Sequence, residues 1–365
     1  MKVLYFLRGL NIGGAETFAY NVLEKIDSEK YHIDFVIQDK EIKNTALQLF
    51  CENTQSNIYT IPAFEKHYLS SIYQCVKLIK KNRYDVVHYH ANSLINMAPY
   101  YSCVITNTNL IIHSHNSSNN LGGKFGRFLH SLNRKYLANK PIGRLACSDK
   151  AGKWMFGNKE YTLVNNGINI DKFKYSAQNA SKLRKKYNIS ESDIVIGHIG
   201  RFTEAKNHKF LIECFQQIAR IKEAKLVMVG DGPLLDGFKR IYGNDPNIIF
   251  IGGVQNTSEL YSLFDIMIFP SVFEGLPFVL VEAQASGLPV LASDFITKEV
   301  NVTELINYYS LENSSELWAN EALRILSSSK NKRLMIGEQM KNTIFDSDLT
   351  VKILCSIYSN YEREF

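Results

Sequence analysis

The sequence of 365 residues has no long apolar run, no short internal repeat and no low-complexity segment. A membrane-spanning helix needs roughly 18 consecutive apolar residues, which no segment approaches, so we expect a chain that does not cross a bilayer. The N-terminal apolar run is short and breaks at Arg8, so we interpret it as a first core strand and not as a signal peptide. With 45% hydrophobic and 21% charged residues, the composition excludes collagen-like, coiled-coil and disordered proteins.

The cysteines are scattered and form no CxxC pair. Several of the six lie in apolar stretches, where a thiol behaves as a small hydrophobic group. Because no export signal is visible, we expect a cytoplasmic location with reduced thiols, and leave open a peripheral attachment to the inner face of the cell membrane. The six are Cys51, Cys75, Cys103, Cys147, Cys214 and Cys355.

The net charge of +6 is unevenly distributed along the chain. Residues 1–175 carry 22 Lys and Arg against 13 Asp and Glu, whereas residues 176–365 carry 20 against 23. A basic first half suggests an anionic partner, such as an acidic membrane surface or a nucleic acid. Nucleic-acid binding calls for stacking aromatics among the cations, but most of the 20 Tyr and 21 Phe fall at core spacing. We therefore expect no nucleic-acid partner.

Short apolar runs alternate with helix-patterned segments, which is typical of parallel sheets covered by helices on both faces. The helical patterns include Glu65–Lys81, Asn207–Ile221 and Asn256–Phe264. Because the strands restart after a polar segment between Asn165 and Ser192, we predict two such sheets. The candidate strands are Lys2–Leu7, His32–Gln38, Asn57–Pro62, Tyr84–His90, Asn109–His115, Arg144–Ser148, Ile194–Gly200, Lys225–Gly230, Asn247–Ile251, Asp265–Pro270 and Leu288–Ala292.

The stretch FPSVFEGLPFVLVEAQASGLPVLAS, residues 269–293, is the most informative part of the chain. A strand that ends at Pro270 should be followed by a helix, because Pro277 suits a first helical turn. Glu274 then stands just before this helix, whose free N–H groups favour a phosphate, and Glu282 lies on its second turn. The two carboxylates could accept hydrogen bonds from a sugar and a ribose diol, or could merely complement the helix dipole and face water.

Two further segments follow strands and could contact the same ligand. In GRFTEAKNH, the cations Arg201 and Lys206 could neutralise a diphosphate or could belong to a solvated loop. Near the N-terminus, Gly13 and Gly14 open a helix, and glycines there let the backbone approach a ligand closely. This turn is not a GxGxxG motif, so by itself it is weak evidence for a binding site.

Two HxH pairs, His88/His90 and His113/His115, lie on neighbouring candidate strands. Alternate residues of a strand share a face, so the four imidazoles could bind zinc, or could be half-buried rings with hydrogen-bonded partners. A metal-dependent hydrolase is therefore an alternative function, although it leaves residues 269–293 unexplained.

Taken together, the motifs resemble those of the retaining glycosyltransferases of family four, which have the GT-B fold. The resemblance covers essentially the whole chain and is closest to bacterial exopolysaccharide and capsule enzymes. The motifs are GGAE at Gly13–Glu16, HSHN at His113–Asn116, NNGIN at Asn165–Asn169, GRFxxxKN at Gly200–Asn207, VGDGP at Val229–Pro233, the EGLP stretch that begins at Glu274, and SDFITKEV at Ser293–Val300.

The resemblance implies an α/β fold of two Rossmann-like, doubly wound parallel-sheet domains that face a central cleft. We expect an acceptor-side domain over 1–170, a linker over 171–192 and a nucleotide-sugar donor domain over 193–345. The apolar helical pattern of Leu349–Tyr361 then marks a last helix, 346–365, which crosses back to the first domain.

On the donor side, the resemblance implies that two cations hold the diphosphate and stabilise the charge that grows as the glycosidic bond breaks. One carboxylate and the backbone after it would bind the donor sugar and phosphate, and the second carboxylate would bind the ribose. These residues are Arg201 and Lys206, then Glu274, Gly275 and Leu276, then Glu282.

On the first domain, the resemblance implies that Gly13 and Gly14 approach the donor phosphates. His115 would position or polarise the reacting sugar, with His90, His113 and Asn116 as pocket neighbours.

No metal or other cofactor is expected. The single DxD, Asp346-Ser347-Asp348, stands before an apolar helix and is more simply a cap. The family mechanism retains the anomeric configuration by attack on the front face, with the leaving diphosphate helping to deprotonate the acceptor hydroxyl.

The segment 122–140 has an apolar stripe flanked by Lys and Arg, and its sequence is GGKFGRFLHSLNRKYLANK. This pattern fits a helix on an anionic membrane surface, or an ordinary core-facing helix with a basic solvated side. The expected partners are thus a nucleotide-sugar donor, with UDP as the default base, and a saccharide or lipid-linked acceptor. A sugar-nucleotide epimerase on the same fold, and a non-catalytic binding module, stay as alternatives.

Overall fold

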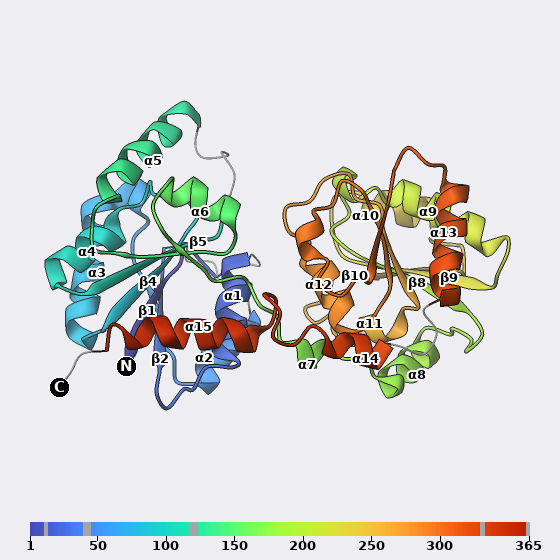
Figure 1. Cartoon of the computed structure of the whole chain (residues 1–365), viewed down its shortest axis with the longest axis horizontal. Coiled ribbons are helices and arrows are strands. Elements are labelled where there is room, and N and C mark those ends of the chain that lie inside the picture. Colours follow the sequence, from blue (N-terminus) through green and yellow to red (C-terminus); the bar gives the residue numbers. More distant parts are fainter. Residues whose placement is uncertain (11–13, 39–44, 117–122, 329–332, 363–365) are drawn as a thin grey trace. The chain divides into compact units, whose positions relative to one another are not determined.

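The computed structural model describes residues 1–10, 14–38, 45–116, 123–328 and 333–362, which form two compact α/β units (Figure 1). The first unit comprises Met1–Gly167 and Ser347–Phe365, and the second comprises Ile168–Asp346. Each unit contains one sheet whose described strand pairs are all parallel. The predicted class of two doubly wound parallel-sheet domains is therefore confirmed.

The first unit has a seven-stranded sheet in the order β3-β2-β1-β4-β5-β6-β7. Its strands are β1 (Lys2–Phe6), β2 (His32–Ile37), β3 (Ile58–Thr60), β4 (Val86–Ala91), β5 (Asn109–Ser114), β6 (Gly143–Ala146) and β7 (Thr162–Leu163). Its helices are α1 (Gly14–Leu23), α2 (Thr45–Asn53), α3 (Phe64–Asn82), α4 (Ala98–Thr106), α5 (Gly123–Leu137), α6 (Asp149–Phe156) and α15 (Ser347–Ser359).

Apolar residues occupy both faces of this sheet, as a parallel sheet between two helical layers requires. On β1, Val3 and Tyr5 join a cluster that contains Phe18 of α1 and Leu354 of α15. The intervening Leu4 joins a second cluster, which includes buried residues of α3, α4 and α6. Helices α1 and α15 therefore cover one face of the sheet, and α3, α4 and α6 cover the other.

The second unit has a six-stranded sheet in the order β10-β9-β8-β11-β12-β13. Its strands are β8 (Ile194–Ile199), β9 (Ala224–Val229), β10 (Ile248–Gly252), β11 (Ile266–Phe269), β12 (Val290–Ser293) and β13 (Ile306–Tyr309). Its helices are α7 (Ile170–Phe173), α8 (Ala177–Lys186), the 3-10 helix η1 (Glu204–Lys206), α9 (His208–Ala219), α10 (Leu235–Tyr242), α11 (Leu260–Leu263), α12 (Phe278–Ala285), the 3-10 helix η2 (Lys298–Val300), α13 (Ser315–Ser328) and α14 (Arg333–Glu338).

The strand orders define one position per sheet where a ligand is expected. In each sheet the second and third strands lie on one side of the first strand, and the fourth strand lies on its other side. Strand β1 therefore neighbours β4, and β8 neighbours β11. Open α/β sheets bind ligands at such a reversal, beyond the carboxyl ends of the strands. In the first unit, the carboxyl end of β4 carries His90. In the second unit, the carboxyl ends of β8 and β11 lead into the loops that contain Arg201 and Glu274.

Several elements differ from the expected ones. The segment 171–192, expected as a linker, instead contributes α7 and α8 to the second unit, because Phe173 and Leu183 are buried in its core. Strands β7 and β13 were not expected, since one has only two residues and the other reads INYY without an apolar run. Only four residues of the expected helix Asn256–Phe264 are helical.

The C-terminal helix α15 follows the second unit directly and packs within the first. A glycine permits its approach, because a Cβ on Gly167 would lie 2.6 Å from the Ser347 nitrogen. The Thr350 hydroxyl then donates to the Asn165 carbonyl (3.1 Å). The NNGIN segment is thus the place where the returning helix docks.

The two ends of the second unit lie beside one another. Ile168 donates its N–H to the Phe345 carbonyl (2.8 Å), and an isolated parallel bridge joins Ile168 to Asp346. The chain therefore leaves the first unit after Gly167 and returns to it after Asp346. The two connecting stretches of backbone are hydrogen-bonded to each other.

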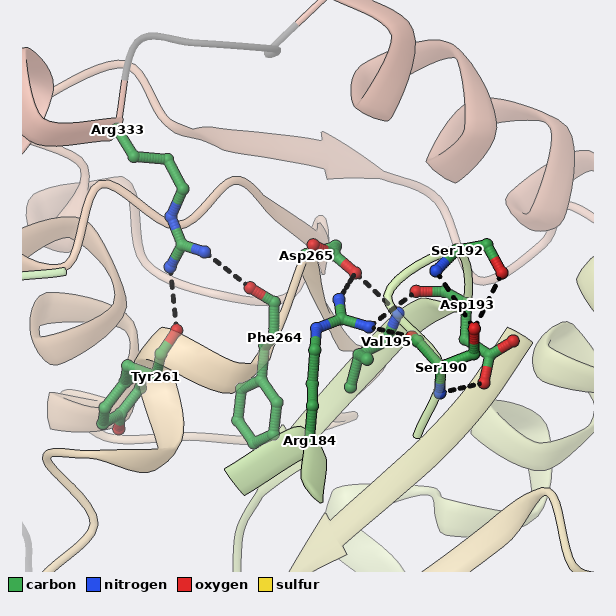
Figure 2. Close-up of polar contacts among 9 residues, drawn as sticks. All are labelled: Arg184, Ser190, Ser192, Asp193, Val195, Tyr261, Phe264, Asp265 and Arg333. Carbon is green, nitrogen blue, oxygen red and sulfur yellow. Dashed lines mark hydrogen bonds and ion pairs between the residues drawn. The ribbon is translucent and has the colours of Figure 1, made fainter. Parts of the chain in front are cut away.

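Two arginines hold the edge of the second sheet where its strands begin (Figure 2). Arg184 donates to Asp265 (3.0 Å), whose carboxylate also accepts the Val195 N–H (2.8 Å). Arg333 donates to the carbonyls of Phe264 (2.7 Å) and Tyr261 (2.8 Å), and its burial lowers its pKa to about 10. These contacts stabilise the edge opposite to the one where a ligand is expected.

Candidate functional site

A largely buried ion pair between Lys206 and Glu274 lies where β8 and β11 end. The Lys206 Nζ is 2.5 Å from the Glu274 Oε1, and the two side chains are only 16% and 14% exposed. The Val272 N–H donates to the Ala205 carbonyl (2.9 Å) and so joins the two loops. The ammonium also lies 4.8 Å from the centre of the Phe269 ring, within cation–π distance. Two of the predicted donor residues therefore meet at one edge of the sheet.

Glycines make room for this pair. A Cβ on Gly200 would lie 3.2 Å from the Lys206 Cε, so this glycine opens the path of the lysine side chain. Gly230 has φ +145°, and a Cβ there would lie 1.9 Å from the Gly200 carbonyl oxygen. The Phe202 N–H donates to the Asp231 carbonyl (2.8 Å). The VGDGP turn is therefore structural, since it supports the Arg201–Lys206 loop by backbone contact.

The other donor-side residues surround this pair. Arg201 directly follows the end of β8, and its side chain is exposed. Gly275 is exposed, with nothing within 4 Å of the place a Cβ would take, whereas Leu276 packs against the core. Helix α12 begins after Pro277, and no side chain of the described residues caps its first turn. Its free N–H groups therefore remain available to an anion.

Glu282 is enclosed on α12 and does not simply face water. Its carboxylate accepts a hydrogen bond from the hydroxyl of the buried Tyr261. Burial raises the pKa of Glu282 to about 7, against the lowering effects of the Tyr261 hydrogen bond and the Lys172 charge. The carboxyl therefore titrates near neutral pH, where it can both accept and donate a hydrogen bond.

In the first unit, the four histidines of the HxH pairs form one cluster. His90 and His113 are cross-strand neighbours on β4 and β5, and His88 lies two residues before His90. The His90 Nδ1 is 2.9 Å from the His115 Nε2. Burial lowers the pKa of His115 to about 3, and it lowers the pKa of the other three well below 6.5. All four rings are therefore neutral at physiological pH.

The cluster was tested as a metal site. Ligand nitrogens of His88, His90 and His113 lie within 4.8 Å of one another. The His88 ring, however, is only 18° from parallel to that of His90 and 19° from that of His113, with the rings stacked. Ring lone pairs lie in the ring planes, so stacked rings cannot all point at one ion about 2.0 Å away. The residues as placed do not fit a zinc ion.

The remaining residues of the expected first-domain site are close to this cluster or outside the described chain. Gly13 lies outside the described residues. Gly14 begins α1, and a Cβ there would lie 3.6 Å from the Asn166 Nδ2. Asn116 follows the cluster, and its carbonyl accepts a hydrogen bond from Ser114 (3.4 Å). Hydrogen bonding to Asn166 partly opposes the effect of burial on the pKa of His115.

A cavity of about 430 Å³ opens beside His90 within the first unit. Its wall contains Glu65 and the aromatic residue Phe64. Two amides in the wall are fixed, since Asn96 donates to Gln38 (3.1 Å) and Gln38 donates to Ser71. Oriented amides, a carboxylate and an aromatic ring suit a small polar ligand with apolar faces.

The DxD residues have structural partners. The Asp346 carboxylate accepts the Asn342 N–H (2.8 Å), and Asp348 forms an ion pair with Lys25 (3.2 Å). Asp346 directly precedes α15 and Asp348 is its second residue, where a carboxylate interacts favourably with the helix dipole.

Helix α5 turns its apolar stripe away from the core. Phe125 is 70% exposed and Phe128 63%, whereas Gly126, His130 and Leu137 are buried. The alternative of an ordinary core-facing stripe is therefore wrong. Every described helix is too short or too polar to span a bilayer.

Family comparisons identify both halves of the chain. The model described as "Glycosyl transferases group 1" matches residues 179–343, and the "Glycosyltransferase Family 4" model matches residues 12–172. The putative glycosyltransferase EpsF of Bacillus subtilis is 31% identical over 98% of the chain and 96% of its own length. The chain is a glycosyltransferase of this family.

Two further relatives and a solved structure agree with this glycosyltransferase assignment. The Escherichia coli UDP-Gal:alpha-D-GlcNAc-diphosphoundecaprenol alpha-1,3-galactosyltransferase is 23% identical over 86% of the chain and 85% of that protein. The capsular polysaccharide biosynthesis glycosyltransferase CapH of Staphylococcus aureus is 22% identical, covering 98% of each chain. The structure of Anabaena HepE in complex with UDP aligns with a TM-score of 0.75 at 17% identity, over 99% of the chain and 100% of HepE. The fold of this glycosyltransferase is therefore GT-B.

The sequence did not mark three residues that contact the predicted ones, two of them in the second unit and one in the first. Tyr261 bonds Glu282, Phe269 packs beneath Lys206, and Asn166 lies beside His115. Phe269 and Asn166 belong to motifs that were noted, so their position next to a charged or polar group was available as a signal. Tyr261 lies on the short helix α11 and carries no motif that could have marked it.

Proposed function

We propose that the chain is a retaining glycosyltransferase that moves a sugar from a nucleotide diphosphate sugar, with UDP as the nucleotide, to a saccharide or lipid-linked saccharide. Its setting would be bacterial surface polysaccharide synthesis, which the capsular relative supports. The observation that carries the proposal is the Lys206–Glu274 pair at the reversal of the second sheet, beside the uncapped start of α12. A relative that uses UDP-Gal and a neighbour that binds UDP support the choice of nucleotide.

On the donor side, the leaving diphosphate would take Lys206 and Arg201 as its counter-ions. Lys206 is held by Glu274 and Phe269, so its charge is oriented before the donor arrives. Glu274 would then exchange its lysine partner for hydroxyls of the donor sugar. The backbone of Gly275, which no side chain covers, could approach the sugar and phosphate.

The chemistry needs no second carboxylate. As the bond from the sugar to the diphosphate breaks, negative charge grows on the phosphate oxygens, where the two cations and the α12 N–H groups stabilise it. The acceptor hydroxyl attacks the same face of the sugar and gives its proton to a leaving phosphate oxygen. This path retains the anomeric configuration without the covalent intermediate of retaining hydrolases.

His115 would act as a neutral group, because burial holds its pKa near 3. A neutral imidazole can orient or polarise a sugar hydroxyl by a hydrogen bond, but it carries no proton to donate as an acid at neutral pH. The nearby cavity, with Gln38, Asn96 and Phe64 in its wall, is the proposed acceptor site. Its amides suit sugar hydroxyls, and its aromatic ring suits a sugar face.

A panel of nucleotide sugars, assayed for slow hydrolysis without acceptor, tests the proposal. We expect one UDP-sugar to be hydrolysed, and the rate to be unchanged by EDTA, because Lys206, Arg201 and the α12 terminus supply the positive charge. Restoration of an EDTA-abolished rate by Mg²⁺ or Mn²⁺ would refute metal independence. Failure of every nucleotide sugar to bind or react would refute the transferase proposal, and an inverted product anomer by NMR would refute retention.

We also propose that α5 attaches the protein to an anionic membrane surface. Exposed Phe125 and Phe128 would enter the interface while Lys124 and Arg127, both exposed, contact lipid headgroups. Vesicles containing phosphatidylglycerol should carry the protein upward in flotation, and vesicles of phosphatidylcholine alone should do so poorly. The double variant Phe125→Ser, Phe128→Ser should bind these vesicles at least about tenfold more weakly than the wild type.

The matched control for this experiment is Ile241→Ser, which removes an apolar side chain that is 71% exposed on α10 in the other unit. Its binding to vesicles should equal that of the wild type. Equal flotation with both lipid compositions, or no loss in the double variant, would contradict membrane attachment through α5.

A further inference from the structure

Buried hydrogen bonds link the histidine cluster to the C-terminal helix. The Tyr358 hydroxyl of α15 lies 2.6 Å from the His88 Nδ1 and 2.9 Å from the Tyr5 hydroxyl. The His88 ring stacks on the His90 ring, with centres 4.3 Å apart and planes 18° from parallel. The His90 Nδ1 is in turn 2.9 Å from the His115 Nε2. We propose that Tyr358 is a positioning residue, which holds the His115 ring through His88 and His90.

The network is buried from solvent, so its hydrogen bonds strongly determine the orientation of the rings. Tyr5, Tyr358 and His88 are 0% exposed, and His90 is 5% exposed. Burial raises the pKa of Tyr358 and lowers the pKa of His88, so both groups are neutral and each has one proton to donate. A buried polar atom that loses its hydrogen-bond partner is destabilised by its desolvation, because water cannot reach it to form a replacement hydrogen bond.

The hydrogen bonds between Tyr5, Tyr358 and His88 can run in either direction, and each direction leaves one proton without an acceptor. If Tyr5 donates to Tyr358, and Tyr358 donates to the His88 Nδ1, both phenol protons are used and His88 carries its proton on Nε2. In the opposite direction the Tyr5 proton has no acceptor among the described residues, since its hydroxyl has only the Tyr358 contact. The first arrangement leaves the His88 Nε2–H without an acceptor in the same way, since Nε2 has no partner among the described residues. Tyr358 therefore holds the His88 Nδ1 in either direction.

The Tyr358 hydroxyl is the part of this network that fixes His88. The His88 Nε2 has no hydrogen-bond partner among the described residues, so the bond to Tyr358 alone distinguishes one flip of the ring from the other. Loss of the hydroxyl would free His88, and the stacked His90 would lose its fixed neighbour. The bond from His90 to His115 would then be held less tightly, and a small shift of a reacting group can cost a large factor in rate.

The kinetic test compares Tyr358→Phe with Tyr31→Phe, and this part rests on the proposed role of His115 in sugar transfer. Tyr358→Phe removes a phenol hydroxyl that belongs to α15 and contacts His88. Tyr31→Phe removes a phenol hydroxyl that donates to the Cys355 carbonyl of α15 (3.4 Å) and forms no hydrogen bond with a histidine of the described chain. Tyr358→Phe should lower kcat about tenfold with the donor KM changed less than about twofold, whereas Tyr31→Phe should leave both unchanged. Wild-type kcat in Tyr358→Phe would overturn the proposal.

A spectroscopic test does not depend on activity. In protein labelled with ¹⁵N-histidine, the ring nitrogens of His90 and His115 should shift in Tyr358→Phe and stay in place in Tyr31→Phe. Unchanged ring signals in Tyr358→Phe would overturn the proposal even if the variant were slow, and shifted signals would support it even if no sugar transfer were found. If Tyr358→Phe does not fold, Tyr5→Phe replaces it, with a smaller shift expected in the same rings and none refuting the link.

Discussion

Replacing Lys206 with alanine is expected to lower kcat/KM for the donor by about 10²–10³-fold, as found for the loss of one group that stabilises a developing oxyanion. The Lys206 side chain is only 16% exposed, so solvent screens its charge little, and the cation–π contact and the Glu274 pair fix its direction. Arg201, in contrast, is exposed and less constrained, so Arg201→Ala should cost less. Initial rates of donor hydrolysis and of transfer measure both effects.

The control for this prediction is Lys209→Ala, which removes an exposed cation from the following helix α9. Its rate should equal that of the wild type. Because Lys206→Ala leaves Glu274 without its partner, the thermal unfolding midpoint of this variant is measured as well, which separates lost catalysis from the destabilising effect of an unpaired buried charge. Near wild-type turnover in Lys206→Ala would show that the pair is only structural and would remove both residues from the site.

Acid should destabilise the first unit strongly between about pH 6.5 and pH 3. Burial lowers the pKa of His115 from 6.5 to about 3, and lowers the pKa of His88, His90 and His113 in the same direction. Below pH 6.5 these histidines bind protons in the unfolded chain but stay neutral in the folded unit. The free energy of unfolding therefore falls as the pH falls through this range, and these groups do not change it above pH 6.5. His115 alone should remove about 1.4 kcal/mol per pH unit across this window.

Hydrogen exchange of peptides from β4 and β5, measured from pH 7.5 to pH 4.5 with correction for intrinsic rates, reports on this unit by itself. A local probe is needed because Glu282, with a pKa raised to about 7, acts in the opposite sense in the second unit. It binds a proton more readily when folded, so its contribution to stability grows as pH falls from 7 to 4.5.

A matched pair of variants makes the acid prediction specific. His115→Gln should reduce the slope of stability against pH, because one buried group that refuses a proton is removed. The control His67→Gln, on an exposed position of α3, should leave the slope unchanged. A pH-independent stability of β4 and β5 would contradict neutral, buried imidazoles in this cluster.

The sheets were predictable because most of their strands are short apolar runs followed by helix-length segments. The strand Lys2–Leu7 was expected and β1 is Lys2–Phe6, and the same holds for β8 and β9 within one or two residues. The error over the expected linker arose because the burial of α7 and α8 is decided by tertiary packing. Helix α8 reads AQNASKLRKK, which is polar in sequence, yet its few apolar residues are enclosed by α11 and the core.

The candidate site was predictable wherever a motif stands at a strand end. Arg201, Lys206 and Glu274 follow β8 and β11, which neighbour each other in the sheet, so their proximity follows from parallel topology. The links between distant motifs were not predictable. Tyr358 reaches His88 across 270 positions of sequence, and no local pattern in Leu349–Tyr361 announces a hydrogen bond there.

The adjacent chain crossings at Ile168 and Asp346 make the second unit an insertion in the first. A segment whose two ends are hydrogen-bonded neighbours can be cut out and replaced by another with the same spacing, at little cost to the host fold. If the second unit binds the donor as proposed, exchange of residues 168–346 between related enzymes would transfer the donor preference. The histidine cluster and its tyrosine anchor would stay behind intact, because α15 belongs to the host.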